Sequence, residues 1–143
     1  MKEIMVFTDG STLNNQKKGG RKGGAGVFFK DNDPMNISYP LVENKKFKVT
    51  NNVAELTATI MAIETILSSM KIGKKKIAIY TDSMYVINIA KEWAKKWEKN
   101  DWKKSNNKKV ENLTLVKKMY YLAKNLNVRM VHVRAHKDEP SKD

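Results

Sequence analysis

Two stretches of the chain share one pattern, in which an apolar run leads to an aromatic residue, Thr, Asp and a nearby Ser. They read "MVFTDGS" over residues 5–11 and "IAIYTDS" over residues 77–83, and they place Asp9 and Asp82 at equivalent positions. Short apolar runs of this kind, rich in β-branched and aromatic residues, favour strands. We therefore predict two similar strands that each end at a carboxylate, and this repeat limits the possible folds more than any other feature.

The remaining sequence alternates between strand and helix patterns. The expected strands cover residues 2–9, 24–30, 35–42, 74–81 and 127–133, and the expected helices cover residues 50–70, 83–97 and 110–124. Apolar residues on both faces of the first strand predict that it is covered on both sides. Residues 10–24 read as a loop, and Asn52 followed by Glu55 predicts a capping box.

The order of these elements predicts the topology. Three strands joined by short loops favour an antiparallel meander. A helix between the third and fourth strands requires a crossover, so the first and fourth strands should pair in parallel. The fold class is therefore α/β, with a five-stranded mixed sheet of three antiparallel strands followed by two parallel ones, flanked by helices.

Three acids are candidates for a metal site. Ligands of open α/β sheets collect at the carboxyl ends of the strands, where Asp9 and Asp82 would lie side by side. Glu55, in the first turn of the intervening helix, would join them. Close carboxylates repel one another unless a cation lies between them, and oxygen donors favour Mg²⁺ or Mn²⁺. The chain has no Cys and only two His, which argues against zinc.

Each acid also has a plain structural interpretation. Asp9 before a glycine is typical of a turn. Asp82 suits the cap of a helix that begins near Ser83, and Glu55 completes the capping box. The same pattern at two adjacent strand ends favours a shared site over three separate coincidences.

The charge of the chain is strongly positive. The 28 Lys and Arg residues outnumber the 15 Asp and Glu residues, which gives a net charge of +13, and only three of the basic residues are Arg. Residues 91–124 hold 11 Lys against four acids, and all three Trp lie in "KEWAKKWEKNDWKK". Lys suits phosphate groups better than base edges, which favours nucleic-acid binding without sequence preference. An evenly solvated surface or a lysine-rich coding bias is the alternative.

Other features of the sequence bear on the cellular location and on the number of domains. No run approaches the roughly 18 apolar residues that a membrane span needs, and "MKEIMVF" lacks the pattern of a signal peptide. The absence of Cys agrees with a reducing compartment. We expect one domain over residues 1–143 that is monomeric, cytoplasmic and not bound to a membrane.

Four segments together resemble type 1 ribonuclease H, the family that cuts the RNA strand of RNA–DNA hybrids. They are "FTDGS" (7–11), "TNNVAEL" (50–56), "YTDSMYV" (80–86) and "VHVRAH" (131–136), in the order that the family has them. The resemblance implies a ribonuclease H-like fold in which Asp9, Glu55 and Asp82 bind two Mg²⁺ ions, or Mn²⁺. It also implies that His136 lies on a loop and aids proton transfer and product release.

The resemblance implies contacts with the hybrid as well. Asn15, Asn51 and Asn52 match positions that contact its backbone and sugars, and Thr50 matches part of a pocket for a DNA-strand phosphate. Residues 91–109 match the basic protrusion of bacterial-type and some eukaryotic members. The expected contacts there are Trp93, Lys95, Lys96, Trp97, Lys99, Trp102, Lys103 and Lys104. The aromatic pair at 93 and 97 is expected to pack the protrusion onto the body, with base stacking as the alternative.

The sequence departs from the family pattern at its C-terminal end. The family has a fourth acid before a last helix, whereas this sequence ends at Asp143, seven residues after His136. We therefore expect the domain to lack its C-terminal segment. The leading hypothesis is an endonuclease that hydrolyses the RNA of RNA–DNA hybrids with two metal ions and leaves 3′-hydroxyl and 5′-phosphate ends.

Two other functions are compatible with the same fold. One is a module that binds hybrids or double-stranded RNA without cutting them. The other is an integrase-like or junction-resolving enzyme with the same acids, against which the protrusion and "TNNVAEL" argue. Fold alone does not separate these functions.

Overall fold

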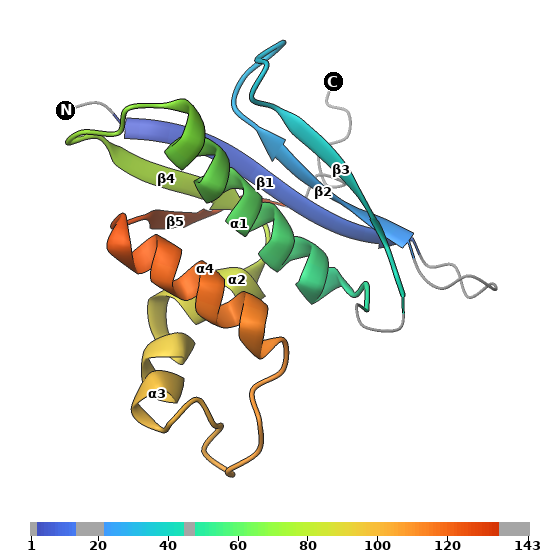
Figure 1. Cartoon of the computed structure of the whole chain (residues 1–143), viewed down its shortest axis with the longest axis vertical. Helices are drawn as coiled ribbons and strands as arrows, with labels where there is room; N and C mark the ends of the chain where they lie inside the picture. Colours follow the sequence, from blue (N-terminus) through green and yellow to red (C-terminus); the bar gives the residue numbers. More distant parts are fainter. Residues whose placement is uncertain (1–2, 14–21, 45–47, 135–143) are drawn as a thin grey trace.

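A five-stranded sheet in the order β3-β2-β1-β4-β5 forms the centre of the molecule (Figure 1). The computed structural model describes residues 3–13, 22–44 and 48–134. The strands are β1 (Glu3–Leu13), β2 (Lys22–Phe28), β3 (Ile37–Val42), β4 (Lys76–Thr81) and β5 (Arg129–His132). The helices are α1 (Asn51–Ser69), α2 (Met84–Asn88), a π-helical turn η1 (Ile89–Trp93), α3 (Ala94–Lys99) and α4 (Leu113–Asn125).

The strand pairing confirms the predicted topology. β1 and β2 are antiparallel, as are β2 and β3. β1 and β4 are parallel, as are β4 and β5. The helix α1 makes the crossover from β3 to β4. Because β1 and β4 are parallel neighbours, their carboxyl ends lie at the same edge of the sheet. This is the α/β class with a mixed sheet that the sequence order predicts.

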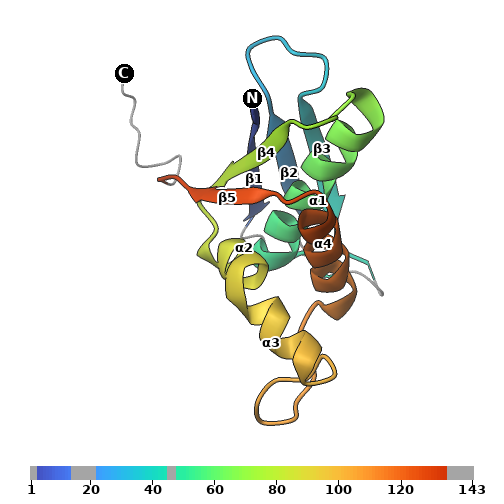
Figure 2. The same cartoon turned by 90° about the vertical axis from the view of Figure 1, so that its left-hand side faces the viewer.

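The helices cover one face of the sheet (Figure 2). α1 contacts β1 and β2, and α4 packs beside α1. The side chains that lie between these layers are fully buried and aliphatic or sulfur-containing, because burial of such surface drives the packing. The largest are Leu56, Ile63, Ile66, Ile77, Ile79, Ile89 and Met119.

The opposite face of the sheet stays open among the described residues. Met5 and Phe7 of β1 are 48% and 40% exposed, whereas their neighbours Val6 and Thr8 are buried. Successive strand residues point to opposite faces, so the exposed pair belongs to the uncovered face. The prediction that the first strand is covered on both sides is therefore wrong for the part of the chain that the structure describes.

The first strand is also longer than predicted. It does not end at Asp9 but runs to Leu13, because it remains paired with β2 after it leaves β4. The last parallel pair with β4 joins Phe7 to Tyr80, whereas Asp9 lies opposite Gly26 of β2. Asp9 thus marks the point where β1 separates from β4, and it is not a turn residue.

Two helix starts differ from the expected ones. Thr50 caps α1, since its Oγ1 accepts a hydrogen bond of 3.1 Å from the N–H of Val53. The capping box of Asn52 and Glu55 is therefore wrong, because Asn52 already lies inside the helix. At α2 the cap is Ser83, whose Oγ accepts from the N–H of Val86, so Asp82 is free of that role.

The second and third predicted helices differ from the prediction in continuity and in starting residue. The helix expected over 83–97 is interrupted by η1, and the helix expected from residue 110 begins at Leu113. Asn112 just before it has a φ of 56°, a left-handed conformation that helix residues do not adopt. No helix among the described residues is long and apolar enough to cross a membrane.

Candidate active site

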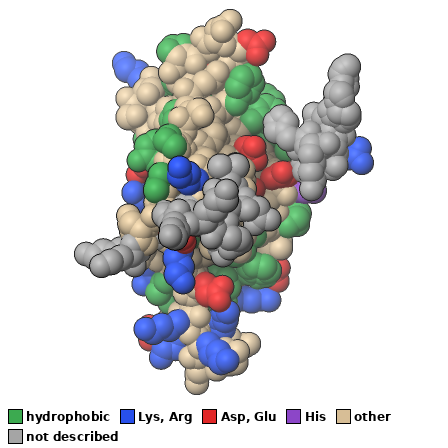
Figure 3. Space-filling model, turned by 90° about the vertical axis from the view of Figure 1, so that its right-hand side faces the viewer, with side chains coloured by type: hydrophobic (Ala, Val, Ile, Leu, Met, Phe, Trp, Pro, Cys, Tyr) green, Lys and Arg blue, Asp and Glu red, His purple; other side chains and the backbone are tan. Residues whose placement is uncertain are grey.

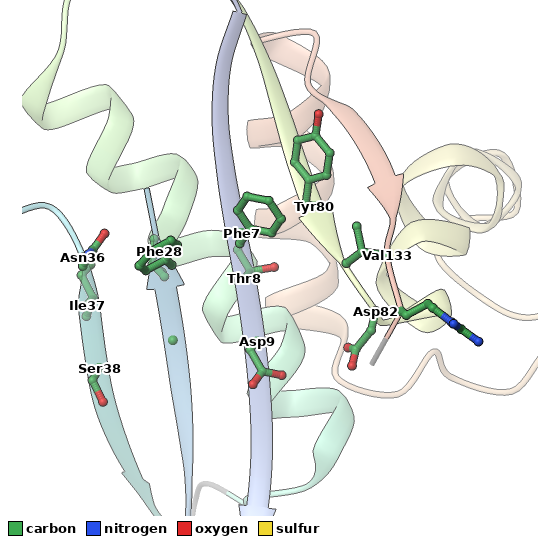
Figure 4. Close-up of a pocket in the computed structure, with 13 residues that line it drawn as sticks. Phe7, Thr8, Asp9, Phe28, Asn36, Ile37, Ser38, Tyr80, Asp82 and Val133 are labelled. Atoms are coloured by element: carbon green, nitrogen blue, oxygen red, sulfur yellow. The ribbon is translucent and has the colours of Figure 1, made fainter. Parts of the chain in front are cut away.

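The two repeated motifs bring their acids together at the carboxyl end of β4. Figure 4 shows Asp9 on β1 and Asp82 just past β4, with both carboxylates turned toward the space where these strands diverge. Asp9 is exposed and Asp82 is half-buried. The parallel register of β1 and β4 places the two motifs side by side, as the sequence repeat predicts.

Glu55 joins them from the first turns of α1. Its Oε1 accepts a hydrogen bond of 2.9 Å from the backbone N–H of Gly10. A Cβ at Gly10 would lie 2.3 Å from the carbonyl carbon of Ala54 and 2.4 Å from the nitrogen of Glu55. Real Cβ contacts are not this short, so only glycine lets β1 approach α1 closely enough for the three acids to meet.

The three carboxylates form a donor set for a divalent metal. Asp9, Glu55 and Asp82 each offer an oxygen atom, and these oxygens lie within 4.8 Å of one another. An all-oxygen set of this kind suits Mg²⁺ or Mn²⁺. The residues present therefore fit the metal site that the sequence predicts.

The electrostatics of the cluster agree with a cation site. Burial raises the pKa of Glu55 from 4.5 to about 8, with a further contribution from the negative charge of Asp82 and a smaller one from Asp9. The hydrogen bond from Gly10 lowers the pKa but does not offset these effects. Without a cation Glu55 thus holds a proton at neutral pH, and a metal ion would take the place of that proton.

An apolar cavity of about 660 Å³ extends from Asp9 and Asp82 along the open face of the sheet. Phe7 and Tyr80 form its floor with their rings stacked at 4.8 Å, and Phe28 lies beside them (Figure 4). Polar residues also line it, among them Asn36, Ser38 and Arg134. Asp9 and Asp82 therefore lie at one end of a larger hollow.

The start of α1 presents polar groups next to the acids. Asn51 and Asn52 are both exposed there, and Thr50 is the cap. The hydroxyl of Thr12, on β1, donates a 2.7 Å hydrogen bond to Oδ1 of Asn51. This bond fixes the Asn51 amide and leaves its N–H donors available to a ligand.

The basic segment forms a projection at one end of the molecule. Figure 3 shows Lys and Arg side chains gathered at the lower end, where Figure 1 places α3 and the loop after it. Lys95, Lys96, Lys99 and Lys103 are exposed, and Lys104 is half-buried. Such a cluster of point charges is suited to a phosphate backbone.

The three tryptophans divide into two groups. All are partly buried against the core, which supports the packing role predicted for Trp93 and Trp97. These two rings lie 5.9 Å apart and border a groove of about 350 Å³. Trp102 does not border it, because its ring lies against Tyr120 and Tyr121 of α4. We call this hollow the protrusion groove, and its lining is Tyr85, Trp93, Trp97, Lys104, Ser105, Val110 and Glu111.

Two of the predicted site residues lie outside the described part of the chain, and two residues that the sequence analysis does not name contribute to the site. Asn15 and His136 lie outside the described residues, and their roles stay predictions. Sequence reasoning missed the part played by Gly10 and by Thr12. Both stand inside or next to the "FTDGS" motif, so their position beside Asp9 was the available signal.

Known proteins give an independent comparison. The family model for RNase H matches residues 1–142. A ribonuclease H of Schizosaccharomyces pombe is 41% identical over 132 residues, which are 92% of this chain and 46% of that protein. A ribonuclease H of Wolbachia pipientis is 36% identical over 135 residues, which are 94% of this chain and 84% of that protein. The chain thus spans about half of the first relative and most of the second.

The fold agrees with this match. A foamy viral protease-reverse transcriptase, solved in complex with an RNA/DNA hybrid, superimposes with a TM-score of 0.67 at 17% identity, over 96% of this chain and 18% of that one. Sequence, fold and the position of the three acids lead to the same assignment, and the chain belongs to the ribonuclease H family.

Proposed function

We propose that this protein hydrolyses the RNA strand of RNA–DNA hybrids and leaves 3′-hydroxyl and 5′-phosphate ends. The observation that carries the proposal is the convergence of three carboxylates, from Asp9, Glu55 and Asp82, within 4.8 Å. The substrate class is supported by family membership and by the structural relative that was solved with an RNA/DNA hybrid.

The three acids would hold two divalent cations, Mg²⁺ or Mn²⁺. When bound, the two ions would activate the attacking water and stabilise the charge on the leaving oxygen. The protein's own contribution is to hold the acids in place before the substrate arrives. One oxygen of Glu55 is fixed by the N–H of Gly10, which holds this carboxyl group beside Asp9 and Asp82.

Hydrolysis forms one bond and breaks one. The water oxygen bonds to the scissile phosphorus, the bond from phosphorus to the 3′-oxygen breaks, and a proton passes to that 3′-oxygen. His136 is the residue that we propose for assistance in proton transfer and product release. This assignment rests on the family resemblance of "VHVRAH".

Binding of the hybrid is assigned to two surfaces. Thr50, Asn51 and Asn52 at the start of α1, with Asn15, would contact backbone and sugar groups next to the acids. The Lys residues of the protrusion would follow the phosphates without sequence preference. Preference for RNA would come from 2′-hydroxyl contacts and helix shape. All three acids come from one chain, so we propose that a monomer is active.

The test is cleavage of a labelled hybrid with Mg²⁺, compared with single-stranded RNA, double-stranded RNA and DNA. We expect cleavage of the hybrid alone and, in Asp9→Asn, a loss of more than about a hundredfold, since a metal ligand is removed. Asp31→Asn makes the same charge change at an exposed turn residue and should leave the rate unchanged. An unchanged rate in Asp9→Asn would refute the metal site, and hybrid binding without cleavage would favour the non-cleaving module.

A further inference from the structure

The loop that leaves α3 begins in an unfavourable conformation. Asp101 and Trp102 have φ values of 57° and 60°, in the left-handed region that favours glycine. A bulky residue is strained in that conformation and persists there only where neighbouring contacts hold it. A local hydrogen bond supplies part of the support for this conformation, because the N–H of Trp102 donates to the carbonyl of Trp97 at 2.6 Å.

The rest of the support comes from α4. The Trp102 ring lies edge-on to Tyr120 and Tyr121, with ring centres 6.0 Å and 6.1 Å away. The Nζ atom of Lys117 lies 5.3 Å from the centre of the same ring. The ring pairs and the cation–π contact of such a cluster stabilise the fold beyond the effect of the apolar area that they bury. The turn after α3 is therefore held against a helix that follows it in the sequence.

Glu98 connects α3 to the same cluster. Its two carboxylate oxygens accept hydrogen bonds from the hydroxyl of Tyr121 at 2.6 Å and from that of Tyr120 at 3.4 Å. The bond from Tyr121 lowers the pKa of Glu98, so the acceptor is ionised at neutral pH. Glu98 is the single acid of α3, whose sequence is AKKWEK.

The negative charge of Glu98 is unfavourable for phosphate binding by the protrusion. An acid among the Lys residues of the protrusion weakens the attraction of that segment to phosphates. What it supplies instead is a connection between the two ends of the loop, α3 on one side and α4 on the other. That loop carries Lys103, and it carries Lys104 and Ser105 into the protrusion groove.

We propose that Glu98 is a positioning residue, which through Tyr121 fixes the loop after α3 so that the protrusion groove and its Lys residues are formed before the hybrid binds. The inference rests on the proposed function, because it assigns the protrusion to hybrid binding. It concerns the affinity for the substrate and not the cleavage step, since Glu98 contacts none of the three acids in the structure.

The experiment compares Glu98→Ala with Glu98→Gln. Both variants lose the negative charge, but Gln keeps an oxygen that accepts from Tyr121, so the pair isolates the hydrogen bond. We expect KM for the hybrid to be about fivefold higher in Glu98→Ala than in Glu98→Gln, as the loss of one such bond predicts. The kcat values should agree within about twofold. Tyr121→Phe, which keeps the charge of Glu98, should raise KM as well.

Electrostatics alone predicts no difference between the two variants, because both lose the same negative charge, and it predicts tighter binding than in the parent. If Glu98→Ala and Glu98→Gln have the same KM, or if both bind the hybrid more tightly than the parent to the same extent, the positioning role is overturned. Amide hydrogen exchange over residues 100–105 of the free protein gives a second readout that needs no substrate. Faster exchange in Glu98→Ala than in Glu98→Gln supports the anchor, and equal exchange overturns it.

The two readouts separate this inference from the proposed function. A parent protein that neither binds nor cleaves hybrids would refute the proposed function, and hydrogen exchange would then still decide whether Glu98 orders the loop. A parent that cleaves hybrids, with no difference between the Ala and Gln variants, would refute the positioning role alone.

Discussion

The backbone N–H of Gly10 donates a 2.9 Å hydrogen bond to Oε1 of Glu55, across 45 positions of the sequence. This bond connects the strand that carries Asp9 to the helix that carries the second acid of the cluster. The geometry of the site thus depends on the closest approach between β1 and α1, and not only on the acids themselves.

Gly10→Ala should disrupt both stability and activity. The added Cβ would lie 2.3 Å from the Ala54 carbonyl carbon, so α1 must shift away from β1. We expect a loss of about 1–3 kcal/mol in the free energy of unfolding, as in other overpacked sites, together with loss of hybrid cleavage. Denaturant unfolding and a cleavage assay measure the two effects. Gly24→Ala is the control, because its nearest contact is 3.8 Å away.

The raised pKa of Glu55 predicts how stability depends on pH in the metal-free protein. The folded state holds a proton on Glu55 up to about pH 8, whereas the unfolded chain releases it near pH 4.5. The folded state therefore binds more protons between these values, and stability should fall as the pH rises through this window. Melting temperatures in EDTA, measured from about pH 5 to about pH 9, check this expectation.

Two comparisons isolate the contribution of Glu55. Glu55→Gln has no titrating group at this position, so its melting temperature should fall less over the same range. Mg²⁺ binds the ionised acids and should restore stability at the alkaline end in the parent but not in the variant. Identical pH profiles for the two proteins would contradict the assignment.

The order of the elements follows from the sequence, whereas their ends depend on contacts between distant segments. Alternating apolar residues and the helical period predict all five strands and the three helical regions. The end of β1 was missed because the strand is extended by pairing with β2, which local patterns do not reveal. The sequence predicts Asn52 as the cap of α1, whereas the structure uses Thr50, which also belongs to the residue types that cap helices.

In the site, too, local sequence patterns predict some features, whereas others depend on contacts between distant segments. The repeated motif predicts that Asp9 and Asp82 lie together, because parallel neighbours place equivalent residues side by side. The need for glycine at position 10 appears only once α1 lies against β1. Glu98 reads as one more solvated charge in a lysine-rich segment, and the tyrosines that give it a role are 22 and 23 positions away.

The hydrogen bond from Thr12 to Asn51 predicts an effect on substrate binding. Thr12→Val keeps the shape of the side chain but removes the donor, which leaves the Asn51 amide free to turn. We expect KM for the hybrid to rise about fivefold with little change in kcat, as for the loss of one hydrogen bond. Steady-state kinetics measure this, and Thr12→Ser should behave as the parent does. A change confined to kcat would point to the acids instead.

The Lys residues of the protrusion should determine how hybrid affinity depends on salt. Each phosphate contact releases counterions, so the slope of log affinity against log salt changes by about 0.9 per contact. Lys99→Gln and Lys103→Gln, both at exposed positions, should each make the slope shallower by about that amount, and to the same degree for hybrids of different sequence. Lys74→Gln, at an exposed position just before β4, is the matched control and should leave the slope unchanged. Equal slopes for all four proteins would mean that the hybrid does not contact the protrusion through these charges, and the binding surface would have to be confined to the neighbourhood of the acids.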